Sequence, residues 1–381
     1  MYDVLIVGCG PAGALLASLA SMKGFKVLIV ERKVQIEQPT ICGEFLPDFS
    51  LIRRVFPEDF HSAAEFLRKF FYSKEYILNE TKEVVIDFNG KVKWLKLEGK
   101  VISRKKVVSQ LIKVAKDYGT ELLLSTSYLG SKISSNGEIV SLLRGKKEFL
   151  VNSRIVVGAD GFPSRVSRSM GLNNEVKGED LAYVTVQLAK GVHPESSVYM
   201  GFYKNISPGG YAWIIPRGNS YFGVGVGARS SYRVNIRHCH EIFLRKVGLK
   251  SSGQIYGKAL PVGGIFGNLA NDFSLLVGDA AGLVMPVNGG GIPTAAVSSF
   301  IASEALESWF EEPKNASDQF RRSMIKCFEN TFNVALRARK IVDLLTKHDL
   351  VPILWMIPSS ILRGVIALDK SSLGYKLLDF F

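Results

Sequence analysis

The sequence predicts an α/β protein (α+β overall) in which a doubly wound domain is interrupted by an antiparallel sheet and followed by a helical region. Three observations support this class. A buried strand over residues 3–7 runs into a glycine-rich turn and a helix, strand-like runs separated by turn residues fill residues 184–226, and residues 317–345 have the pattern of one long helix. With 381 residues, the chain is long enough for about two domains.

The order of these patterns also predicts the domain limits. We assign residues 1–75, 100–172 and 258–312 to the doubly wound domain. Residues 76–99 and 173–257 are assigned to the antiparallel-sheet domain, and residues 313–381 to the C-terminal helical region.

The cysteines and histidines argue against a metal site. Cys9, Cys42, Cys239 and Cys327 form no CxxC pair, which speaks against a zinc ribbon or a disulfide scaffold and for a reducing compartment. His238 and His240 lie two residues apart in a helical pattern, and we expect both on the surface.

The chain is basic, with a net charge of +13, and its basic residues are spread along the whole sequence in short groups. This spread argues against nucleic acid and favours an anionic membrane surface or a phosphorylated substrate. The chain enters a strand at Tyr2, so we expect no signal peptide. Prolines and Arg363 interrupt the apolar residues 350–368, so we expect no membrane span there. We therefore expect a cytoplasmic protein with peripheral contact to the inner face of the membrane.

A dinucleotide-binding fingerprint occupies the N-terminus. The strand over residues 3–7 is followed by Gly8-Cys9-Gly10-Pro11-Ala12-Gly13, a helix, and a second buried strand that ends at Glu31 and Arg32. In this Rossmann-like arrangement the glycines allow a tight turn and close approach of a pyrophosphate, and the helix N-terminus supplies N–H donors. The Glu31 carboxylate can accept hydrogen bonds from a ribose. Because no repeated βαβ units follow, the fingerprint is typical of FAD proteins.

Two later segments also deliver a carboxylate from a strand end. One ends in Gly158-Ala159-Asp160-Gly161; the other ends in Gly278-Asp279 and is followed by Gly289-Gly290-Gly291-Ile292. This order resembles the p-hydroxybenzoate-hydroxylase-like flavoprotein superfamily. The resemblance implies that Asp279 holds the ribityl chain of FAD, that the Gly289–Ile292 backbone faces the flavin, and that Asp160-Gly161 borders the cofactor. It also places Arg104, which opens a helix, beside FAD; the alternative is a solvated surface arginine. For Asp160 the alternative is a helix cap.

Residues 208–216, PGGYAWIIP, closely match the PxxYxWxFP motif of the geranylgeranyl reductase family, with Ile215 in place of phenylalanine. Cys42-Gly43-Glu44 is similar to the CGE segment of that family. Tyr211 and Trp213 lie two apart on a predicted strand and therefore face the same side, where they could line an isoprenoid pocket with Pro216. The alternative is that both aromatics are ordinary core residues.

The resemblance implies an FAD-dependent reductase that saturates C=C bonds of polyprenyl lipids by hydride transfer from reduced flavin N5. Tyr211, Trp213, Cys42 and Glu44 are the candidate catalytic residues, and Cys42 and Gly43 are also expected beside the cofactor. Gly223–Gly227 resembles a nucleotide loop but lies in a predicted strand, so the electron donor stays open between a ferredoxin and an NAD(P)H-linked source. The alternatives are a monooxygenase or halogenase of the same fold, or a membrane-surface electron-transfer flavoprotein.

Overall fold

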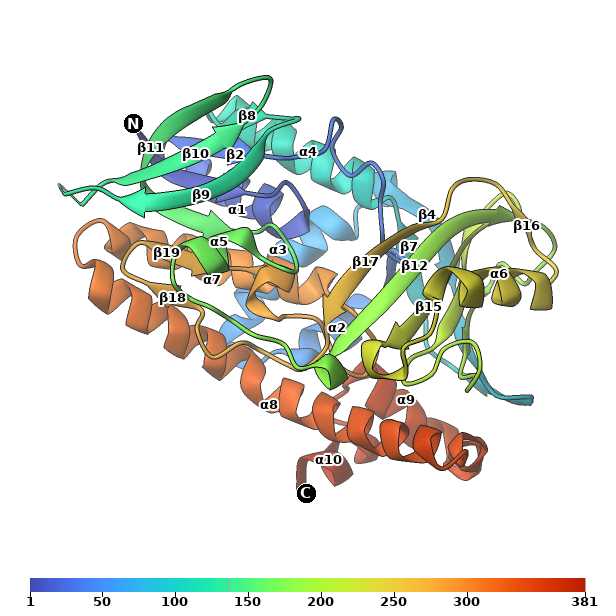
Figure 1. Ribbon diagram of the computed structural model, residues 1–381. Coiled ribbons are helices and arrows are strands. Elements are labelled where there is room, and N and C mark those ends of the chain that lie inside the picture. Colours follow the sequence, from blue (N-terminus) through green and yellow to red (C-terminus); the bar gives the residue numbers. More distant parts are fainter. Residues whose placement is uncertain (136, 381) are drawn as a thin grey trace.

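A computed structural model describes residues 1–135 and 137–380. Two eight-stranded sheets lie at opposite ends of the molecule, and helix α8 (Pro313–Lys347) runs beneath both of them (Figure 1). Helices α9 (Ser359–Ala367) and α10 (Leu373–Phe380) lie on the same side as α8. The predicted mixed architecture with a helical C-terminal region is confirmed.

The first sheet contains the predicted doubly wound core. In spatial order its strands are β18 (Ala270–Asn271), β19 (Ser274–Leu276), β11 (Glu148–Gly158), β1 (Tyr2–Val7), β2 (Val27–Val30) and β8 (Glu121–Leu123), and the hairpin of β9 (Ser127–Ile133) and β10 (Ile139–Arg144) extends β11. The strands from β19 to β8 pair in parallel. Leu5 and Ile6 of β1 are fully buried, as expected for a strand covered on both faces.

Helices pack around this sheet, and α1 lies between α4 and α7. They are α1 (Pro11–Met22), α2 (Phe49–Val55), α3 (His61–Phe71), α4 (Arg104–Asp117), α5 (Arg165–Ser169) and α7 (Ile292–Trp309), with single turns η1 (Glu58–Phe60), η2 (Lys74–Tyr76) and η5 (Gly278–Ala281). In the strand registers, Val7 lies beside Val30 and Gly158, and Gly158 lies beside Leu276. Four strand ends therefore meet at one edge of the sheet, where α/β proteins bind ligands.

The second sheet is mostly antiparallel. Its order is β16 (Lys250–Ser251), β12 (Leu181–Lys190), β15 (Tyr221–Arg229), β14 (Ala212–Gly218), β13 (Ser197–Gly201), β5 (Glu83–Phe88) and β6 (Lys91–Leu95), with β17 (Tyr256–Pro261) also paired to β12. Helix α6 (Ile236–Lys246) covers one face, with turns η3 (Gly178–Asp180) and η4 (Ser230–Tyr232) nearby.

One pair in this sheet departs from the expected antiparallel pattern, because β5 and β13 run parallel. β5 comes from a segment more than a hundred residues earlier in the chain, so no hairpin turn forces the antiparallel direction. A third, small sheet joins β3 (Phe45–Pro47), β7 (Gly99–Ile102) and β4 (Ile77–Thr81) between the two larger ones. The division of the chain into domain segments stays a prediction.

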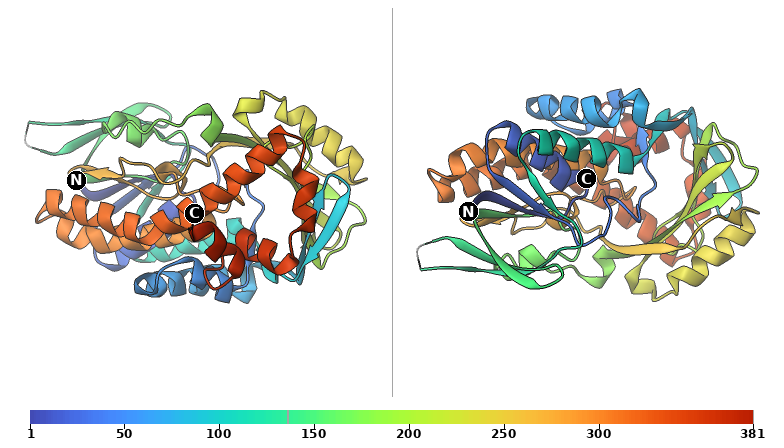
Figure 2. Two further views of the ribbon diagram at one scale, coloured as in Figure 1. Left: turned by 90° about the horizontal axis from the view of Figure 1, so that it is seen from below. Right: turned by 90° about the horizontal axis from the view of Figure 1, so that it is seen from above.

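The C-terminal region closes over the face of the second sheet that α6 does not cover. Turn η6 (Val351–Met356) and helix α9 contribute Leu354, Leu362 and Ala367 to the apolar cluster that includes Trp213 and Ile215. The view from below shows α8, α9 and α10 together on this side of the molecule (Figure 2). Within residues 1–135 and 137–380, no helix is long and apolar enough to cross a membrane.

A buried ionic network joins α8 to the second sheet. Arg229 of β15 donates to both carboxylate oxygens of Asp343, at 3.1 and 3.4 Å, and Arg339 donates to Asp180 at 2.7 Å. Burial lowers the pKa of Arg229, and burial raises the pKa of Asp343. A break in such a network is costly because it leaves an uncompensated charge in the interior. The network therefore fixes where α8 crosses the sheet.

The expected surface position of both histidines is wrong for His240. This side chain is fully buried between α6 and β12, with Nδ1 3.0 Å from Thr185 Oγ1 and Nε2 3.3 Å from Gln187 Oε1, whereas His238 is exposed. The helix turns one histidine inward and the other outward. No cluster of metal-binding side chains occurs in the part of the chain that the structure describes.

Acid should destabilise the protein through His240. Burial lowers the pKa of His240 from 6.5 to about 4, so the unfolded chain binds this proton more tightly than the folded protein. The neutral, buried imidazole thus contributes up to about 3 kcal/mol to the free energy of unfolding. This contribution is present in full above pH 6.5 and is lost as the pH falls to 4. In denaturant titrations at pH 7 and pH 4, His240→Gln should lose less stability than the parent chain. His238→Gln is the matched control on the same helix, and equal losses in all three proteins would contradict the assignment.

Candidate functional site

The glycine-rich turn after β1 is built for close approach. Gly8 has φ +104°, and a Cβ there would lie 2.3 Å from Ala159 O; a Cβ on Gly13 would lie 2.0 Å from Gly8 O. Around Gly10 there is space, since the nearest atom to an added Cβ is 3.8 Å away. Helix α1 begins here without a side-chain cap, so its first N–H groups are free of side-chain acceptors and can bind an anion.

Glu31 lies beside this turn at the end of β2, as the fingerprint predicts. Its buried carboxylate accepts hydrogen bonds from the amides of Cys9 and Lys33, both at 2.9 Å. These bonds fix its direction, and each oxygen keeps a further lone pair for a ribose hydroxyl. Arg32 is exposed.

Asp160 supports the start of helix α5, as the helix-cap alternative expects, although the N-cap residue itself is Ser164. Its carboxylate accepts from Ser164 Oγ at 2.7 Å and from the amides of Arg165 and Val166, at 2.7 and 3.3 Å, at the start of α5. Its backbone still borders the glycine turn, because a Cβ on Gly8 would lie 2.9 Å from Asp160 Cα. Gly161 has φ +74°, and nothing lies within 4 Å of an added Cβ there.

Asp279 lies on the same edge, in the turn after β19. The turn packs on α1, since a Cβ on Gly278 would lie 3.0 Å from Ala12 Cβ. Asp279 Oδ2 pairs with Lys258 Nζ of β17 at 3.0 Å, which brings a cation from the second sheet to this carboxylate. Asp279 also contributes to the electrostatic field at Arg104.

The glycines after this turn lead into α7, which starts at Ile292 without a side-chain cap at Gly291. A Cβ on Gly291 would lie 3.1 Å from Asp279 Oδ1, so the loop and the carboxylate are neighbours. The Gly290 amide donates to the Asn288 side chain at 2.9 Å. The start of α7 therefore presents amides at the same edge as the start of α1.

Arg104 is buried, so the surface alternative is wrong. Its Nε donates to Glu37 Oε2 at 2.8 Å, and a second guanidinium nitrogen donates to the same oxygen. The N-cap of the helix that Arg104 opens is Ser103. Burial alone would lower the pKa of Arg104, but Glu37 and Cys42 outweigh it and the pKa is raised. Glu37 is itself buried, has φ +54°, and directs its other oxygen toward Gly10. The charge of the buried Arg104 guanidinium is therefore compensated by a carboxylate of the chain.

The Cys42-Gly43-Glu44 segment lies between Arg104 and the second sheet. Glu44 Oε1 accepts from the Arg104 amide at 2.7 Å, and Oε2 pairs with Arg217 of β14. Cys42 Sγ accepts from the Glu44 amide at 3.3 Å, and Cys42 is a free thiol. Burial lowers the pKa of Arg217, which Cys42 partly opposes. The segment is thus held from both sides.

Tyr211 and Trp213 face the same side, as their spacing predicts. Their ring centroids are 5.7 Å apart, and Phe202 and Phe88 continue the row with centroid separations of 5.8 and 5.7 Å. A Cβ on Gly225 would lie 2.1 Å from the Trp213 ring, which confirms that the glycines of β15 admit close approach. We call Phe88, Phe202, Tyr211 and Trp213 the aromatic row.

Pro216 does not join the aromatic row. Side chains alternate along β14, and Trp213 and Ile215 belong to the inner apolar cluster whereas Ile214 belongs to the cluster under α6. Pro216 follows Ile215 and so falls on the side of Ile214. The structure therefore separates it from Tyr211 and Trp213.

Tyr211 connects the aromatic row to the glycine loop before α7. Its hydroxyl donates to Asn288 O, and an added Cβ on Gly289 would lie 3.8 Å from the same hydroxyl. Burial raises the pKa of Tyr211, with a contribution from Cys42, so the hydroxyl stays protonated near neutral pH. The indole Nε1 of Trp213 is buried without a protein partner in residues 1–135 and 137–380, and lies 3.7 Å from an added Cβ on Gly43.

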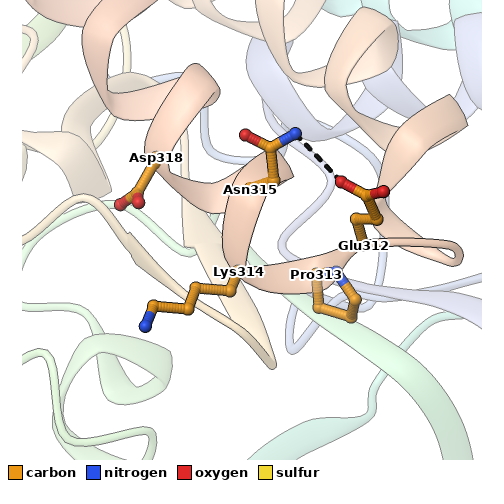
Figure 3. Close-up of a pocket in the computed structure, with 5 residues that line it drawn as sticks. All are labelled: Glu312, Pro313, Lys314, Asn315 and Asp318. Carbon is orange, nitrogen blue, oxygen red and sulfur yellow. Dashed lines mark hydrogen bonds between the residues drawn. The ribbon is translucent and has the colours of Figure 1, made fainter.

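These residues fit FAD. Two uncapped helix starts face one edge, Glu31 and Asp279 offer carboxylates for ribose and ribityl hydroxyls, and a Cβ added to Gly10 would meet no atom closer than 3.8 Å. Two surface hollows lie elsewhere. One is at the start of α8, where Glu312 and Asn315 bond each other (Figure 3), and the other adjoins Met1 and Phe310. Neither contains a predicted site residue.

Four residues of this site were not predicted from the sequence: Glu37, Arg217, Lys258 and Asn288. Each acts through a partner that is distant in sequence, and only Arg217 adjoins a recognised motif. Their residue types alone carry no periodic pattern, so spacing could not reveal them.

Comparison with known proteins identifies the relatives. Residues 181–255 match the geranylgeranyl reductase catalytic domain, and residues 1–40 match an FAD binding domain. A digeranylgeranylglycerophospholipid reductase 3 of Methanosphaera stadtmanae is 31% identical over 79% of this chain and 76% of its own length. A digeranylgeranylglycerophospholipid reductase 2 of Methanopyrus kandleri is 30% identical over 92% of this chain and 88% of its own.

A solved structure shares the fold of this chain. The geranylgeranyl bacteriochlorophyll reductase-like protein of Thermoplasma acidophilum superposes with a TM-score of 0.81, at 23% identity, over 100% of this chain and 95% of that one. The cofactor expected from the fingerprint is thus confirmed as FAD, and a reductase is favoured over a monooxygenase or halogenase. The chain belongs to the geranylgeranyl reductase family of FAD-dependent oxidoreductases.

Proposed function

We propose that this protein saturates C=C bonds in the geranylgeranyl chains of a digeranylgeranylglycerophospholipid. The observation that carries the proposal is the aromatic row, whose Tyr211 bonds the loop that leads to the glycines before α7. A prenyl chain that packs along the aromatic row would pass the glycine loop before α7, at the end of the FAD site. The names of the relatives supply the lipid class.

We propose specific residues for holding FAD. The Gly8–Gly13 turn and the start of α1 would bind the pyrophosphate, Glu31 the adenosine ribose, and Asp279 the ribityl chain. The Gly289–Ile292 backbone would face the pyrimidine edge, where its amides favour the negative charge of the reduced cofactor. Bound and reduced, FAD supplies a hydride from N5.

An isolated alkene has no oxygen on which negative charge develops, so the protein has no oxyanion to stabilise. Catalysis must then come from alignment of the double bond and exclusion of water. The aromatic row supplies alignment on one side. Leu354, Leu362 and Ala367 of the C-terminal region pack into the same apolar cluster and would keep water out.

Three of the candidate catalytic residues, Tyr211, Cys42 and Glu44, have a side chain that can donate a proton to the alkene, and their surroundings differ. Glu44 is bound through one carboxylate oxygen to the Arg104 amide and through the other to Arg217, so both oxygens are engaged and we propose that it positions the Cys42 segment. Tyr211 and Cys42 are the remaining candidates. The Tyr211 hydroxyl is protonated and lies at the loop before α7, where it donates to Asn288 O. Cys42 is a free thiol close enough to affect the pKa of Tyr211.

Tyr211→Phe should lower turnover selectively. The substitution removes the hydroxyl that bonds Asn288 O and keeps the ring in the aromatic row. The expected loss of about 1 kcal/mol in stability is small. Loss of alignment or proton delivery could cost about a hundredfold in rate. FAD content and lipid binding are the controls, and full activity in this variant would make Tyr211 a core residue only.

The reducing electrons must come from outside the chain. The Gly223–Gly227 segment is part of β15, and Gly225 and Gly227 of that strand lie against the Trp213 ring. We propose a ferredoxin or an NAD(P)H-linked donor, and a peripheral position at the inner membrane face, where the lipid substrate resides.

The direct test of this function is the mass of the lipid product. FAD-loaded, dithionite-reduced protein is incubated with digeranylgeranylglycerophospholipid, and the lipid is analysed by mass spectrometry. Each saturated bond should add two hydrogen atoms. A product that gains oxygen or halogen would favour the alternative activities, and an unchanged lipid with fully reduced, FAD-loaded protein would overturn the proposal.

A further inference from the structure

Exposed apolar side chains gather on one part of the C-terminal side. They lie on turn η6 and just before it, and each is 44% to 74% exposed: Leu350, Ile353, Trp355 and Met356. We call these four residues, together with Lys91 and Lys93 of strand β6, the β6–η6 face. Val92 and Trp94 point to the other side of the sheet, because side chains alternate along β6. The two elements adjoin, because Trp355 Nε1 donates to Val92 O at 3.0 Å. The hairpin of β5 and β6 and the C-terminal segment also appear together in the view from below (Figure 2).

Basic side chains accompany these apolar residues. Lys91 and Lys93 place their ammonium groups 6.0 and 5.5 Å from the centre of the Trp355 ring, and Lys93 also donates to Ile357 O at 2.6 Å. An exposed tryptophan beside two lysines is a pattern found where a protein meets the headgroup region of a bilayer. An apolar surface with cations at its border fits an anionic lipid surface.

The same segment has an inner side that belongs to the proposed site. Leu354 lies between exposed Ile353 and Trp355 and is buried in the cluster with Trp213 and Ile215. Farther along, Ile366 O accepts from Asn288 at 2.9 Å, next to the carbonyl that Tyr211 bonds. One layer of chain therefore separates the β6–η6 face from the aromatic row.

We propose that the β6–η6 face docks on an anionic lipid bilayer and that a prenyl chain enters the site beneath it. The proposal rests on the proposed function, since a membrane lipid as substrate gives the site a reason to adjoin the bilayer. Apolar burial would be supplied by η6, and electrostatic attraction by Lys91 and Lys93 of β6 and the net charge of +13. Insertion would be shallow, without a membrane-spanning helix in the described residues.

The test compares vesicle binding of matched variants of the FAD-loaded protein. Vesicles contain either phosphatidylcholine alone or phosphatidylcholine with phosphatidylglycerol, and binding is measured by flotation at low and high salt. Ile353→Glu with Met356→Glu should weaken binding to the anionic vesicles by about tenfold or more. Val192→Glu is the apolar control, because Val192 is 99% exposed in the turn after β12. Lys91→Glu with Lys93→Glu should remove the salt-sensitive part of the binding to anionic vesicles. Lys146→Glu with Lys147→Glu, in the hairpin between β10 and β11, is the control for this charge change.

A second assay separates this proposal from the proposed function. All variants should reduce lipid dispersed in detergent at the parent rate, and the Ile353/Met356 variant should fail only on lipid embedded in vesicles. Parent protein that reduces dispersed lipid but does not float, or a face variant that floats like Val192→Glu, would overturn the docking proposal alone. A dimer in solution that the Ile353/Met356 variant breaks, without any vesicle binding, would assign the face to a second copy and also overturn it. Vesicle binding that depends on the face, without lipid reduction in either assay, would leave docking in place and refute the proposed function.

Discussion

Glu37→Gln is expected to lower the free energy of unfolding by about 3–5 kcal/mol, because it leaves the Arg104 guanidinium buried without its counter-charge. The pair is almost completely enclosed, with side chains that are 2% exposed for Glu37 and 11% for Arg104. Chemical denaturation of FAD-free protein measures this loss. Glu65→Gln is the control, since Glu65 forms an ion pair with Arg68 on the surface of α3, where such pairs contribute little.

FAD should recover part of this loss. The Glu37 carboxylate lies against the glycine turn, so a bound phosphate would offer Arg104 a replacement anion. Saturating FAD should then raise the melting temperature of Glu37→Gln more than that of the parent. A loss below about 1 kcal/mol would show that Arg104 is not held by this carboxylate. Equal stabilisation by FAD in both proteins would place Arg104 away from the phosphates.

Trp213→Ala is expected to affect stability and turnover together. The indole lies across Gly225 and is 8% exposed, so truncation leaves a cavity that costs about 3–5 kcal/mol. Misalignment of the prenyl chain by ~1 Å would cost about a hundredfold in rate in addition. Stability is measured by denaturation, and rate by lipid reduction at full FAD occupancy.

Trp213→Phe keeps the protein folded and isolates the role in alignment. This variant retains an aromatic ring but removes the Nε1 group that has no protein partner in the described residues. We expect a smaller loss of stability and a larger effect on long prenyl chains than on short ones. If Trp213→Phe reduces every chain length at the parent rate, Trp213 serves only the core.

Part of the first sheet could be predicted because its pattern is local. Strands β1, β2, β11 and β19 each end in an apolar run followed by glycine or a carboxylate, and parallel strand ends must meet at one edge, which brought Glu31, Asp160 and Asp279 to adjacent loops. The other four strands of the sheet, β8, β9, β10 and β18, lack this pattern and were not predicted. The positions of Tyr211 and Trp213 also followed from strand alternation alone. The tight space at Gly225 confirmed why glycines interrupt that strand.

The remaining features depend on contacts between distant segments. The parallel pairing of β5 with β13 has no turn residues to announce it. Arg104 has the residue type of a surface position, and only its pairing with Glu37 allows its burial.

The inward position of His240 follows from which side of α6 faces β12. Ile236, Cys239 and Phe243 recur at helical spacing and mark that side, so this signal was present in the sequence and the prediction overlooked it.

The most direct measurement of the central claim is anaerobic reoxidation of the bound, reduced flavin by the lipid. A stopped-flow trace after mixing with digeranylgeranylglycerophospholipid should show the oxidised flavin spectrum returning, with one double bond saturated for each flavin oxidised. Tyr211→Phe should slow this phase at equal FAD content. Flavin that stays reduced until oxygen is admitted, with the lipid chains still unsaturated, would contradict the assignment of this chain as a prenyl-lipid reductase.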